Sequence, residues 1–481
     1  MRRILLFATS FFLLPFLMPL SALAVVRSLS LGMSGSDVTA LQTELIAKGY
    51  LATGKNTGYF GLLTQIALEK FQCDQKITCA TSAISGYGIY GPKTRQALLG
   101  VGSSAGVVTT SKLEFSGWIP YWRTDAGIQD VTPHLSQLTS VMPFGYTVKS
   151  NGTLSDTAKI TEEPWKSFIA TAKKNKVRVI PTVMWGNGDT IHKILSNTKT
   201  RIALEDEIAN MVKKNGFDGI DIDFEAKKHE TVDYFSTFLK GLYQRMGNKW
   251  VYCTVEARMP LNDRYSPSAT IPADATDYAN DYAQINKYCD RVEIMAYDQG
   301  VIDVRLNKAR SAPYAPVADP GWVESMVTLA MNDIAKNKII IGIPTYGYEY
   351  TVTPLATGGY KYDVLWPFNL KYATDIATKL GITPTRTSAN EIGFSYDPKK
   401  LEAIAPTGSE STQTQQNTVS SSVAQNAGSQ VDTSQPFNYL SWSDATAIAD
   451  KVALARKLGV RGVAVFKFDG GEDQGMWNVL K

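Results

Sequence analysis

Eight short apolar runs recur between residues 115 and 468, and stretches with a helical spacing of apolar residues separate them. Strands that alternate with helices form a parallel sheet, because each helix returns the chain to the same end of the sheet. Eight such units predict an α/β fold, a (β/α)8 TIM barrel with its active site at the C-terminal ends of the strands. A Rossmann-type open sheet is the alternative, and it is disfavoured because no glycine-rich phosphate turn follows the first run. The predicted strands are Phe115–Tyr121, Leu138–Tyr146, Val177–Met184, Gly219–Phe224, Trp250–Glu256, Arg291–Tyr297, Ile339–Thr345 and Gly462–Phe468.

The regular spacing breaks between the seventh and eighth predicted strands. Residues 348–440 hold additional strand-like pieces, which predicts a small α+β insertion over the strand ends. Within it, residues 407–435 are mostly Ser, Thr, Gln and Asn, and such a composition buries too little apolar area to order itself. We therefore expect a disordered surface loop there, within a barrel domain that spans residues 113–481.

The segment 25–100 contains an internal repeat, in which an aromatic residue and a glycine open a helical pattern. A further helical pattern precedes the two copies, since Val38, Leu41 and Leu45 are spaced as on one helix face. These patterns predict a small all-α domain of three helices, followed by a flexible linker over residues 101–112. The two copies are Phe60-Gly61-x-x-Thr64-x-x-Ala67-Leu68 and Tyr90-Gly91-x-x-Thr94-x-x-Ala97-Leu98.

Together with further residues, this repeat resembles the peptidoglycan-binding domain of bacterial wall hydrolases. The resemblance implies a three-helix domain that directs the chain to the cell wall; a helical spacer that binds nothing is the alternative. The stretch from Cys73 to Ser85 departs from the pattern, because it is longer and more polar than usual between the second and third helices. The matching residues are Gly32, Gly35, Val38, Leu41, Gln42, Leu45, Gly49, Tyr50, Gly58, Phe60, Gly61, Thr64, Phe71, Gln72 and Gly91 to Thr94.

The chain begins with Met1-Arg2-Arg3, an apolar run over residues 4–20 and the small-residue segment Ser21-Ala22-Leu23-Ala24. This order is typical of a secretory signal peptide, so we predict a signal over residues 1–24 with cleavage after Ala24. An uncleaved membrane anchor is the alternative, and it is disfavoured because the run is near the lower end of the lengths that span a bilayer. We expect a secreted protein, extracellular or bound to the cell wall, with no membrane contact after cleavage.

The chain has four cysteines and three histidines. An exported chain can oxidise its cysteines, and the short separation of Cys73 and Cys79 predicts a disulfide between them. For Cys253 and Cys289, a second disulfide and two buried thiols both stay open. The histidines lack metal-ligand spacing, so we predict neither a metal nor a cofactor; they are His134, His192 and His229.

The charge balance disfavours one class of partner. Lys and Arg number 49 against 45 Asp and Glu, a formal net charge of +4, whereas a nucleic-acid-binding domain is expected to be strongly basic. The charge balance therefore favours a neutral or wall-like partner over nucleic acid. We expect a monomer.

The fourth predicted strand carries the candidate catalytic carboxyls. A strand period of two places Asp221, Asp223 and Glu225 on one face and the apolar residues between them on the other. Three carboxylates in a row cannot all stay ionised in a partly desolvated barrel, so some of their pKa values must rise. Glu225 is last in the row, nearest the open end, and is the predicted general acid and base. A magnesium or calcium site is the alternative, but the run lacks the glycine and ligand spacing of a calcium loop.

The run from Asp218 to Glu225, D-x-x-D-x-D-x-E, resembles the signature of glycoside hydrolase family 18, the chitinase-like family. Met295-Ala-Tyr297-Asp298, at the end of the sixth predicted strand, resembles the M-x-Y-D motif of the same family. We expect Met295 to line the substrate site with Tyr297, because the two share one strand face.

The spacing of Asp223 and Glu225, about 7 Å along the strand, lies between those of retaining and inverting carboxylate pairs and leaves the mechanism open. The resemblance implies that the acetamide oxygen of the substrate is the nucleophile, so that the anomeric configuration is retained. It also implies that Glu225 protonates the glycosidic oxygen, that Asp223 orients the acetamide and that Asp221 shares a proton with Asp223. Tyr297 would bind the acetamide carbonyl, and Asp298 would help to hold the distorted sugar.

Aromatic residues at other strand ends are candidates for stacking on sugar rings. We expect Tyr121, Tyr146 and Trp185 to do so. Arg258, after the fifth strand, is expected either to bind a polar sugar group or to pair with Glu256.

The family usually places a tryptophan in the last strand, under the reacting sugar, whereas here Phe466 offers a smaller ring. That departure leaves the preferred sugar open. The leading hypothesis is an exported hydrolase that cuts β-1,4 bonds next to N-acetylated sugars in cell-wall peptidoglycan. The alternatives are a chitinase acting on chitin oligomers and a catalytically silent, lectin-like binder. Glu225 disfavours the binder, since such binders typically lack that acid.

Overall fold

The computed structural model describes residues 29–79, 87–99, 113–404 and 431–481. The chain divides into two compact units, Met1–Gly106 and Val107–Lys481. The predicted signal peptide and linker, and most of the predicted disordered loop, lie outside the described residues. No helix within the described ranges is long and apolar enough to cross a membrane.

The first unit contains three helices around a small apolar core, as the repeat predicts. The two copies of the sequence repeat also make equivalent hydrogen bonds. The side-chain amide of Gln42 donates to Thr64 at 2.9 Å and accepts from the backbone of Gly58, while that of Gln72 donates to Thr94 at 2.9 Å. The predicted disulfide between Cys73 and Cys79 is formed. The helices are α1 (Ser36–Ala47), α2 (Leu62–Asp74) and α3 (Pro92–Leu99).

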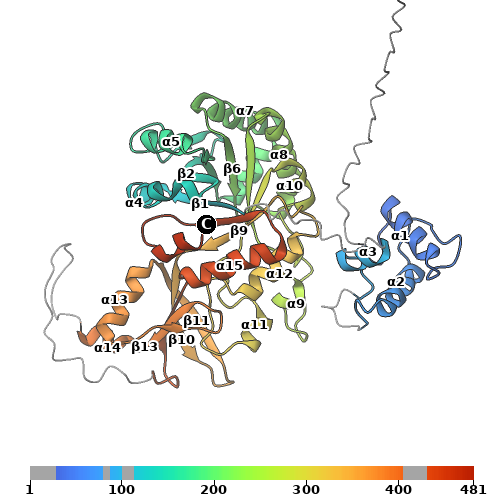
Figure 1. The fold of residues 1–481 in the computed structure, drawn as a ribbon. Coiled ribbons are helices and arrows are strands. Elements are labelled where there is room, and N and C mark those ends of the chain that lie inside the picture. Colours follow the sequence, from blue (N-terminus) through green and yellow to red (C-terminus); the bar gives the residue numbers. More distant parts are fainter. Residues whose placement is uncertain (1–28, 80–86, 100–112, 405–430) are drawn as a thin grey trace, which may run out of the picture. The chain divides into compact units, whose positions relative to one another are not determined.

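The second unit is built on eight parallel strands that close into a barrel (Figure 1). Each strand pairs with its neighbours in chain order, and the last pairs with the first to close the ring. The eight strands correspond one to one with the eight predicted runs. They are β1 (Glu114–Pro120), β2 (Ser140–Val148), β5 (Thr182–Trp185), β6 (Gly219–Phe224), β7 (Trp250–Glu256), β8 (Arg291–Met295), β9 (Ile339–Pro344) and β15 (Gly462–Phe466).

Two short strands accompany β2. The third predicted run is interrupted at Pro181, which has no N–H to donate to the strand ladder. The part before it, β4 (Arg178–Val179), pairs with β2 in parallel. A further strand, β3 (Leu154–Asp156), pairs with β2 antiparallel.

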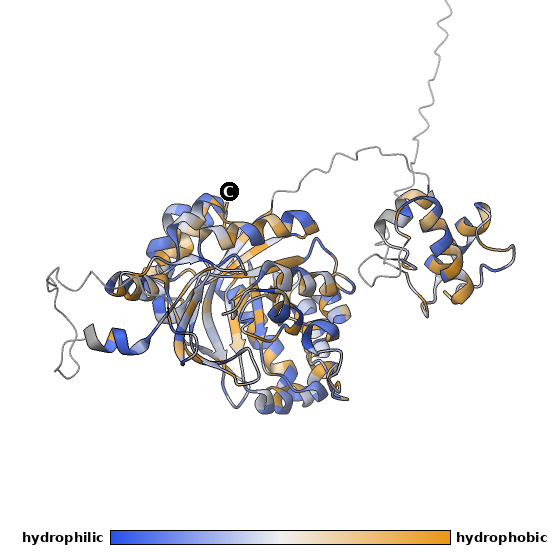
Figure 2. Ribbon diagram, turned by 90° about the horizontal axis from the view of Figure 1, so that it is seen from below, coloured by the Kyte–Doolittle hydropathy of each residue, from blue (hydrophilic) through white to orange (hydrophobic). Residues whose placement is uncertain are grey.

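Helices connect the barrel strands and cover the barrel from outside. In α8 the buried residues Phe235, Phe238, Leu239 and Leu242 recur at intervals of three and four, so one face of the helix is apolar. Figure 2 shows apolar and polar residues together on the helices around the barrel. The α-helices are α4 (Thr124–Val131), α5 (Trp165–Lys174), α6 (Gly188–Ser196), α7 (Thr198–Asn215), α8 (Val232–Met246), α9 (Leu261–Arg264), α10 (Tyr282–Tyr288), α11 (Val304–Ala309), α12 (Pro320–Ala330) and α15 (Ala445–Leu458). The 3-10 turns are η1 (Tyr121–Arg123), η2 (Thr132–Gln137), η3 (His229–Thr231) and η4 (Gln474–Asn478).

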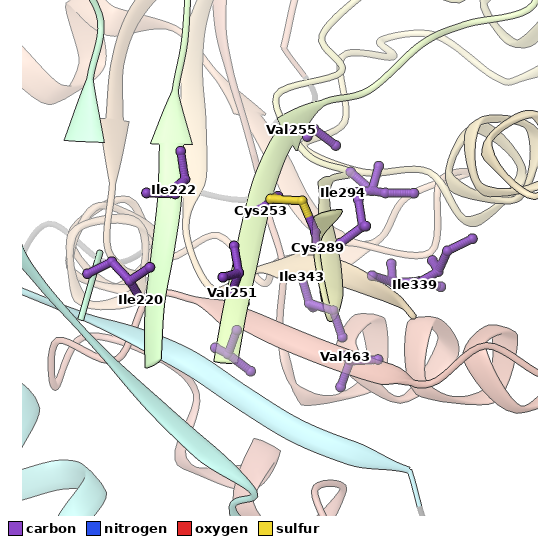
Figure 3. Packing of buried hydrophobic residues seen from close by; sticks show 14 of the residues in the cluster. Ile220, Ile222, Val251, Cys253, Val255, Cys289, Ile294, Ile339, Ile343 and Val463 are labelled. Carbon is purple, nitrogen blue, oxygen red and sulfur yellow. A yellow bond between two sulfur atoms is a disulfide. The ribbon is translucent and has the colours of Figure 1, made fainter. Parts of the chain in front are cut away.

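The strands separate two cores by alternation. Outward residues, among them Ile220, Ile222 and Val251, pack against the helices (Figure 3). Cys253 and Cys289 lie in this layer and form a second disulfide, which settles the pairing that the sequence left open. Inward residues form a separate cluster inside the barrel, and it consists of Trp118, Met142, Phe144, Ile180, Tyr252, Ile340 and Ala464.

The predicted insertion between the seventh and eighth barrel strands is an antiparallel sheet of five strands, in the order β11-β10-β14-β13-β12, with helices packed on it (Figure 1). The predicted fold class is thus confirmed. The elements of the insertion are β10 (Gly347–Pro354), β11 (Tyr360–Phe368), α13 (Leu370–Leu380), β12 (Thr385–Arg386), β13 (Ile392–Tyr396), α14 (Pro398–Ile404) and β14 (Phe437–Trp442).

Candidate active site

The carboxyl row of β6 points into the barrel, as the strand period requires. Asp221, the deepest member, is fully buried and accepts three hydrogen bonds from three other barrel strands. Its Oδ2 accepts from the hydroxyl of Thr182 at 2.8 Å and from the indole of Trp118 at 3.1 Å. Its Oδ1 accepts from the hydroxyl of Thr254 at 2.9 Å. Burial raises the pKa of Asp221, and these hydrogen bonds oppose the rise because they stabilise the anion.

Asp223 and Glu225 follow toward the open end of the barrel. Burial raises the pKa of Asp223 well above its usual value, and the charges of Glu225 and Asp221 raise it further. Burial also raises the pKa of the half-buried Glu225, helped by the charge of Glu256 and opposed by that of Lys227. These raised pKa values favour the protonated forms of Asp223 and Glu225, and a general acid must be protonated to act.

An ion pair between Lys227 and Glu256 lies near Glu225. The buried ammonium of Lys227 is 3.6 Å from Glu256 and donates to the backbone carbonyl of Phe224. Glu256 also accepts from the backbone N–H of Ala226 at 2.9 Å. Burial lowers the pKa of Lys227, and the facing charge of Glu256 opposes that effect. Our sequence predictions gave Lys227 no role, although it follows the acidic motif by two residues.

A fourth carboxyl, Glu293 of β8, also lies inside the barrel and is fully buried. The hydroxyl of Thr254 contacts it at 3.3 Å. Burial raises the pKa of Glu293 well above its usual value, and the charge of Asp221 adds to the rise. The sequence predictions missed Glu293, although its spacing of four from Tyr297 places both residues on the inward face of one strand.

Tyr297 and Phe466 lie against each other beside the carboxyl row. Their rings stack with centroids 5.5 Å apart and planes 16° from parallel. Gly342 of β9 makes room for them, since a Cβ at that position would lie 2.8 Å from the Tyr297 ring. Burial raises the pKa of Tyr297 well above its usual value, so its hydroxyl keeps its proton and can donate a hydrogen bond.

Asp298 follows in a left-handed backbone conformation with φ of 63°, a strained state for a residue with a side chain. Its Oδ1 accepts from the hydroxyl of Tyr346 at 2.6 Å and from that of Tyr348 at 3.0 Å. Burial raises the pKa of Asp298, and these two hydrogen bonds oppose the rise. Asp298 is therefore held at the start of the loop after β8 by two residues from the start of the insertion.

A hollow of about 760 Å³ opens above these residues, between the barrel and the insertion. Its walls are largely aromatic, and Trp122 and Trp366 keep 50% and 45% of their surface exposed. Its lining includes Asp298 and also Phe466, whose ring stacks on that of Tyr297. Flat apolar walls with a few polar groups are what a sugar chain requires of its binding site. Among the residues that line the hollow are Trp122, Asp298, Tyr346, Trp366 and Phe466.

The predictions that Tyr146 and Trp185 stack on sugar rings are wrong. Tyr146 and Trp185 are buried in the outer core, on the face of the sheet that packs against the helices. The pairing of β5 with β6 places Trp185 level with Phe224, an outward residue. For Tyr146, an irregularity in the pairing of β2 with β5 breaks the alternation, so it lies outward although Phe144 lies inward.

The other predicted binding residues have mixed positions. The guanidinium of Arg258 lies between the rings of Tyr278 and Tyr282, at 4.2 and 3.9 Å from their centroids. It lines a different hollow of about 240 Å³. Glu256 pairs with Lys227, so the expected ion pair of Arg258 with Glu256 is not formed among the described residues. Sugar binding by Arg258 stays a prediction. Tyr121 is 38% exposed and contacts the ring of Trp122 at 5.0 Å, outside the lining of the large hollow. Met295 is half-buried at the end of β8.

No group of three or more His, Cys, Asp or Glu side chains suited to a metal ion occurs within residues 29–79, 87–99, 113–404 and 431–481. A parallel (β/α)8 barrel with proton-holding carboxyls at its C-terminal face and an aromatic hollow above them has the architecture of a glycoside hydrolase.

Comparison with known proteins points to the same class of protein. The model of glycosyl hydrolases family 18 matches residues 115–471, and that of a peptidoglycan binding domain matches residues 34–98. The chain therefore belongs to glycosyl hydrolases family 18, and it has a further region that matches a peptidoglycan binding domain.

The individual relatives share low sequence identity with this chain. The uncharacterised glycosylase YvbX of Bacillus subtilis is 26% identical over 47% of this chain and 62% of its own length. Two further Bacillus subtilis relatives are covered over 49% of their lengths, so the chain spans about half of these curated relatives. The spore cortex-lytic enzyme SleL of Bacillus megaterium has a TM-score of 0.54 at 19% identity, covering 76% of this chain and 73% of that one. A chitinase from Chromobacterium violaceum has a TM-score of 0.55 at 17% identity, covering 76% and 98%. At these identities the two structures show a shared fold.

Proposed function

We propose that this chain is an exported glycosidase that hydrolyses β-1,4 bonds next to N-acetylated sugars in cell-wall peptidoglycan. The observation that carries the proposal is the inward row of Asp221, Asp223 and Glu225, in which Asp223 and Glu225 have raised pKa values, on the same chain as a peptidoglycan binding domain. The relative SleL is named for lysis of the spore cortex, which supports a wall substrate for a barrel of this fold. Export would follow from the predicted signal over residues 1–24.

The geometry supports a retaining mechanism assisted by the substrate acetamide. The buried Oδ1 of Asp223 has no hydrogen-bond partner within the described residues, so it can accept from an acetamide N–H. The hydroxyl of Tyr297 can donate to the acetamide carbonyl. In the first step Glu225 gives its proton to the glycosidic oxygen while the acetamide oxygen attacks the anomeric carbon. In the second step Glu225 takes a proton from the water that opens the oxazolinium, so the configuration is retained.

The test compares two substrates. Purified peptidoglycan and chitin oligomers are digested side by side, and mass spectrometry identifies the new reducing ends. We expect cleavage of peptidoglycan, with an N-acetylated sugar at each new end and the original anomeric configuration. Cleavage of chitin oligomers alone would refute the wall assignment and leave the chitinase.

Glu225→Gln separates an enzyme from a binder. We expect its turnover to fall by about 10²- to 10⁴-fold while the affinity for oligosaccharide persists, because one general acid contributes that much. Glu230→Gln is the matched control, since Glu230 is exposed and forms only a 3.9 Å contact with Lys228. A lectin-like protein would show no hydrolysis before or after either change.

A further inference from the structure

The hydroxyl of Thr254 lies between the catalytic row and the fourth barrel carboxyl. It is 2.9 Å from Oδ1 of Asp221 and 3.3 Å from Oε2 of Glu293. All three side chains are buried. Oε1 of Glu293 has no hydrogen-bond partner in the described part of the chain.

The single hydroxyl proton of Thr254 limits the ionisation states that Asp221 and Glu293 can have together. A threonine hydroxyl has a single proton to donate, so it cannot donate to both acids. The second contact is a hydrogen bond only if the second carboxyl is protonated and donates to the hydroxyl oxygen. Asp221 has the shorter contact and already accepts from Thr182 and Trp118. This geometry favours Asp221 as the anion and Glu293 as the protonated acid.

The surroundings of Glu293 favour the same assignment. It is fully buried, and burial raises its pKa well above the usual value. The titratable groups that face Glu293 are acids or phenols, and negative charge on any of them opposes ionisation of Glu293. Its titratable neighbours are Asp221 and Asp223 of β6, Glu114 of β1, Tyr252 of β7 and Tyr297 after β8.

We propose that Glu293 is a positioning residue: its carboxyl stays protonated, donates to the Thr254 hydroxyl and so commits that hydroxyl to Asp221. Asp221 then receives three donors and stays ionised through the catalytic cycle. The mobile proton of the row is thereby confined to Asp223 and Glu225. This role rests on the proposed function, because only a hydrolase needs the proton of the row at its open end.

The first test is Glu293→Gln, which keeps a neutral donor of the same shape. We expect kcat, KM and the acid limb of the pH profile of kcat/KM to stay at wild-type values. If Glu293 were ionised, its removal would lower the pKa of the row, and the acid limb would move to lower pH by about one unit or more. That shift would overturn the proposal.

The second test is a double-mutant cycle. Glu293→Leu removes the donor, and we expect kcat to fall about three- to tenfold at unchanged KM, with the acid limb moved to higher pH. Thr254→Val should give an equal or larger effect, and the double variant should be no worse than Thr254→Val alone, because Glu293 acts through Thr254. Additive losses, or a loss at Glu293→Leu without a shift of the acid limb, would show a merely structural role.

A third measurement does not depend on turnover. The infrared difference spectrum of wild type minus Glu293→Gln at neutral pH should show the loss of a protonated carboxyl band. Loss of a carboxylate band instead would refute the assignment of Glu293. If wild type cleaves no glycan but the protonated band is present, the proposed function fails while the protonation of Glu293 stands.

Discussion

The hydroxyl of Thr182 offers a direct test of the charge on Asp221. Thr182 is fully buried and donates to Oδ2 of Asp221 at 2.8 Å. Thr182→Val removes that donor while keeping nearly the same shape, so no large cavity forms. A hydrogen bond to a charged group contributes about 1.5–3 kcal/mol. Its loss should raise the pKa of Asp221 by about one to two further units.

The sign of the pH dependence follows from the direction of the shift. Burial already raises the pKa of Asp221 above its usual value of 3.8, so its ionised form is unfavourable in the folded state. The variant adds to this cost only where Asp221 is ionised in folded wild type, that is above its raised folded-state pKa, because the ionisation of the unfolded chain is the same for both proteins. We expect the variant to lose about 1.5–3 kcal/mol of unfolding free energy at pH 7, and the difference from wild type to shrink as the pH falls toward 4.

The assay is denaturant unfolding of both proteins at several pH values, combined with the pH profile of kcat/KM. The acid limb of that profile should move up by about one to two units. Thr345→Val is the control, because the Thr345 hydroxyl donates to the backbone carbonyl of Lys467 at 2.8 Å and its loss should be independent of pH. A Thr182→Val deficit that is equal at pH 4 and pH 7 would refute an ionised Asp221.

Three further changes test other parts of the site. Gly342→Ala would place a methyl group 2.8 Å from the Tyr297 ring, so we expect a loss of about 1–3 kcal/mol in unfolding free energy together with a lower kcat; wild-type kcat would show that Tyr297 has no fixed position in the reaction. Trp366→Ala removes an exposed wall of the hollow, and KM for oligosaccharides should rise about two- to tenfold with kcat little changed; an unchanged KM would exclude Trp366 from sugar binding. Replacing Cys253 and Cys289 by serine opens a bridge across 36 residues and should cost about 3–4 kcal/mol in urea unfolding, whereas an unchanged midpoint would mean that the two are not bonded in solution.

The acidic site was predictable because it depends on local chain geometry. A strand turns alternate residues to one side, so the positions of Asp221, Asp223 and Glu225 in the sequence suffice to place them on one face of β6. Met295 and Tyr297 follow the same alternation along β8, and two other predicted site residues, Asp298 and Phe466, line the hollow. The eight alternating runs likewise sufficed for the barrel.

The stacking residues were less predictable, because their direction depends on the neighbouring strand. Tyr146 lies outward owing to an irregularity in the pairing of β2 with β5, which the sequence of β2 alone does not show. Trp185 lies outward because its register matches Phe224. Arg258 is held between two tyrosines that follow it by twenty residues or more, so its position depends on how the loop after β7 folds.

The sequence by itself determined the barrel, the insertion, the repeat domain and the inward acidic row, since each follows from a periodicity along one segment. Only the tertiary structure decided the ionisation pattern, because the donors of Asp221 come from β1, β5 and β7. The contact of Thr254 with Glu293 exists for the same reason. Closure of the barrel brings the inward side chains of these strands together in one interior, and the low polarity of that interior then makes each hydrogen bond decide where a proton resides.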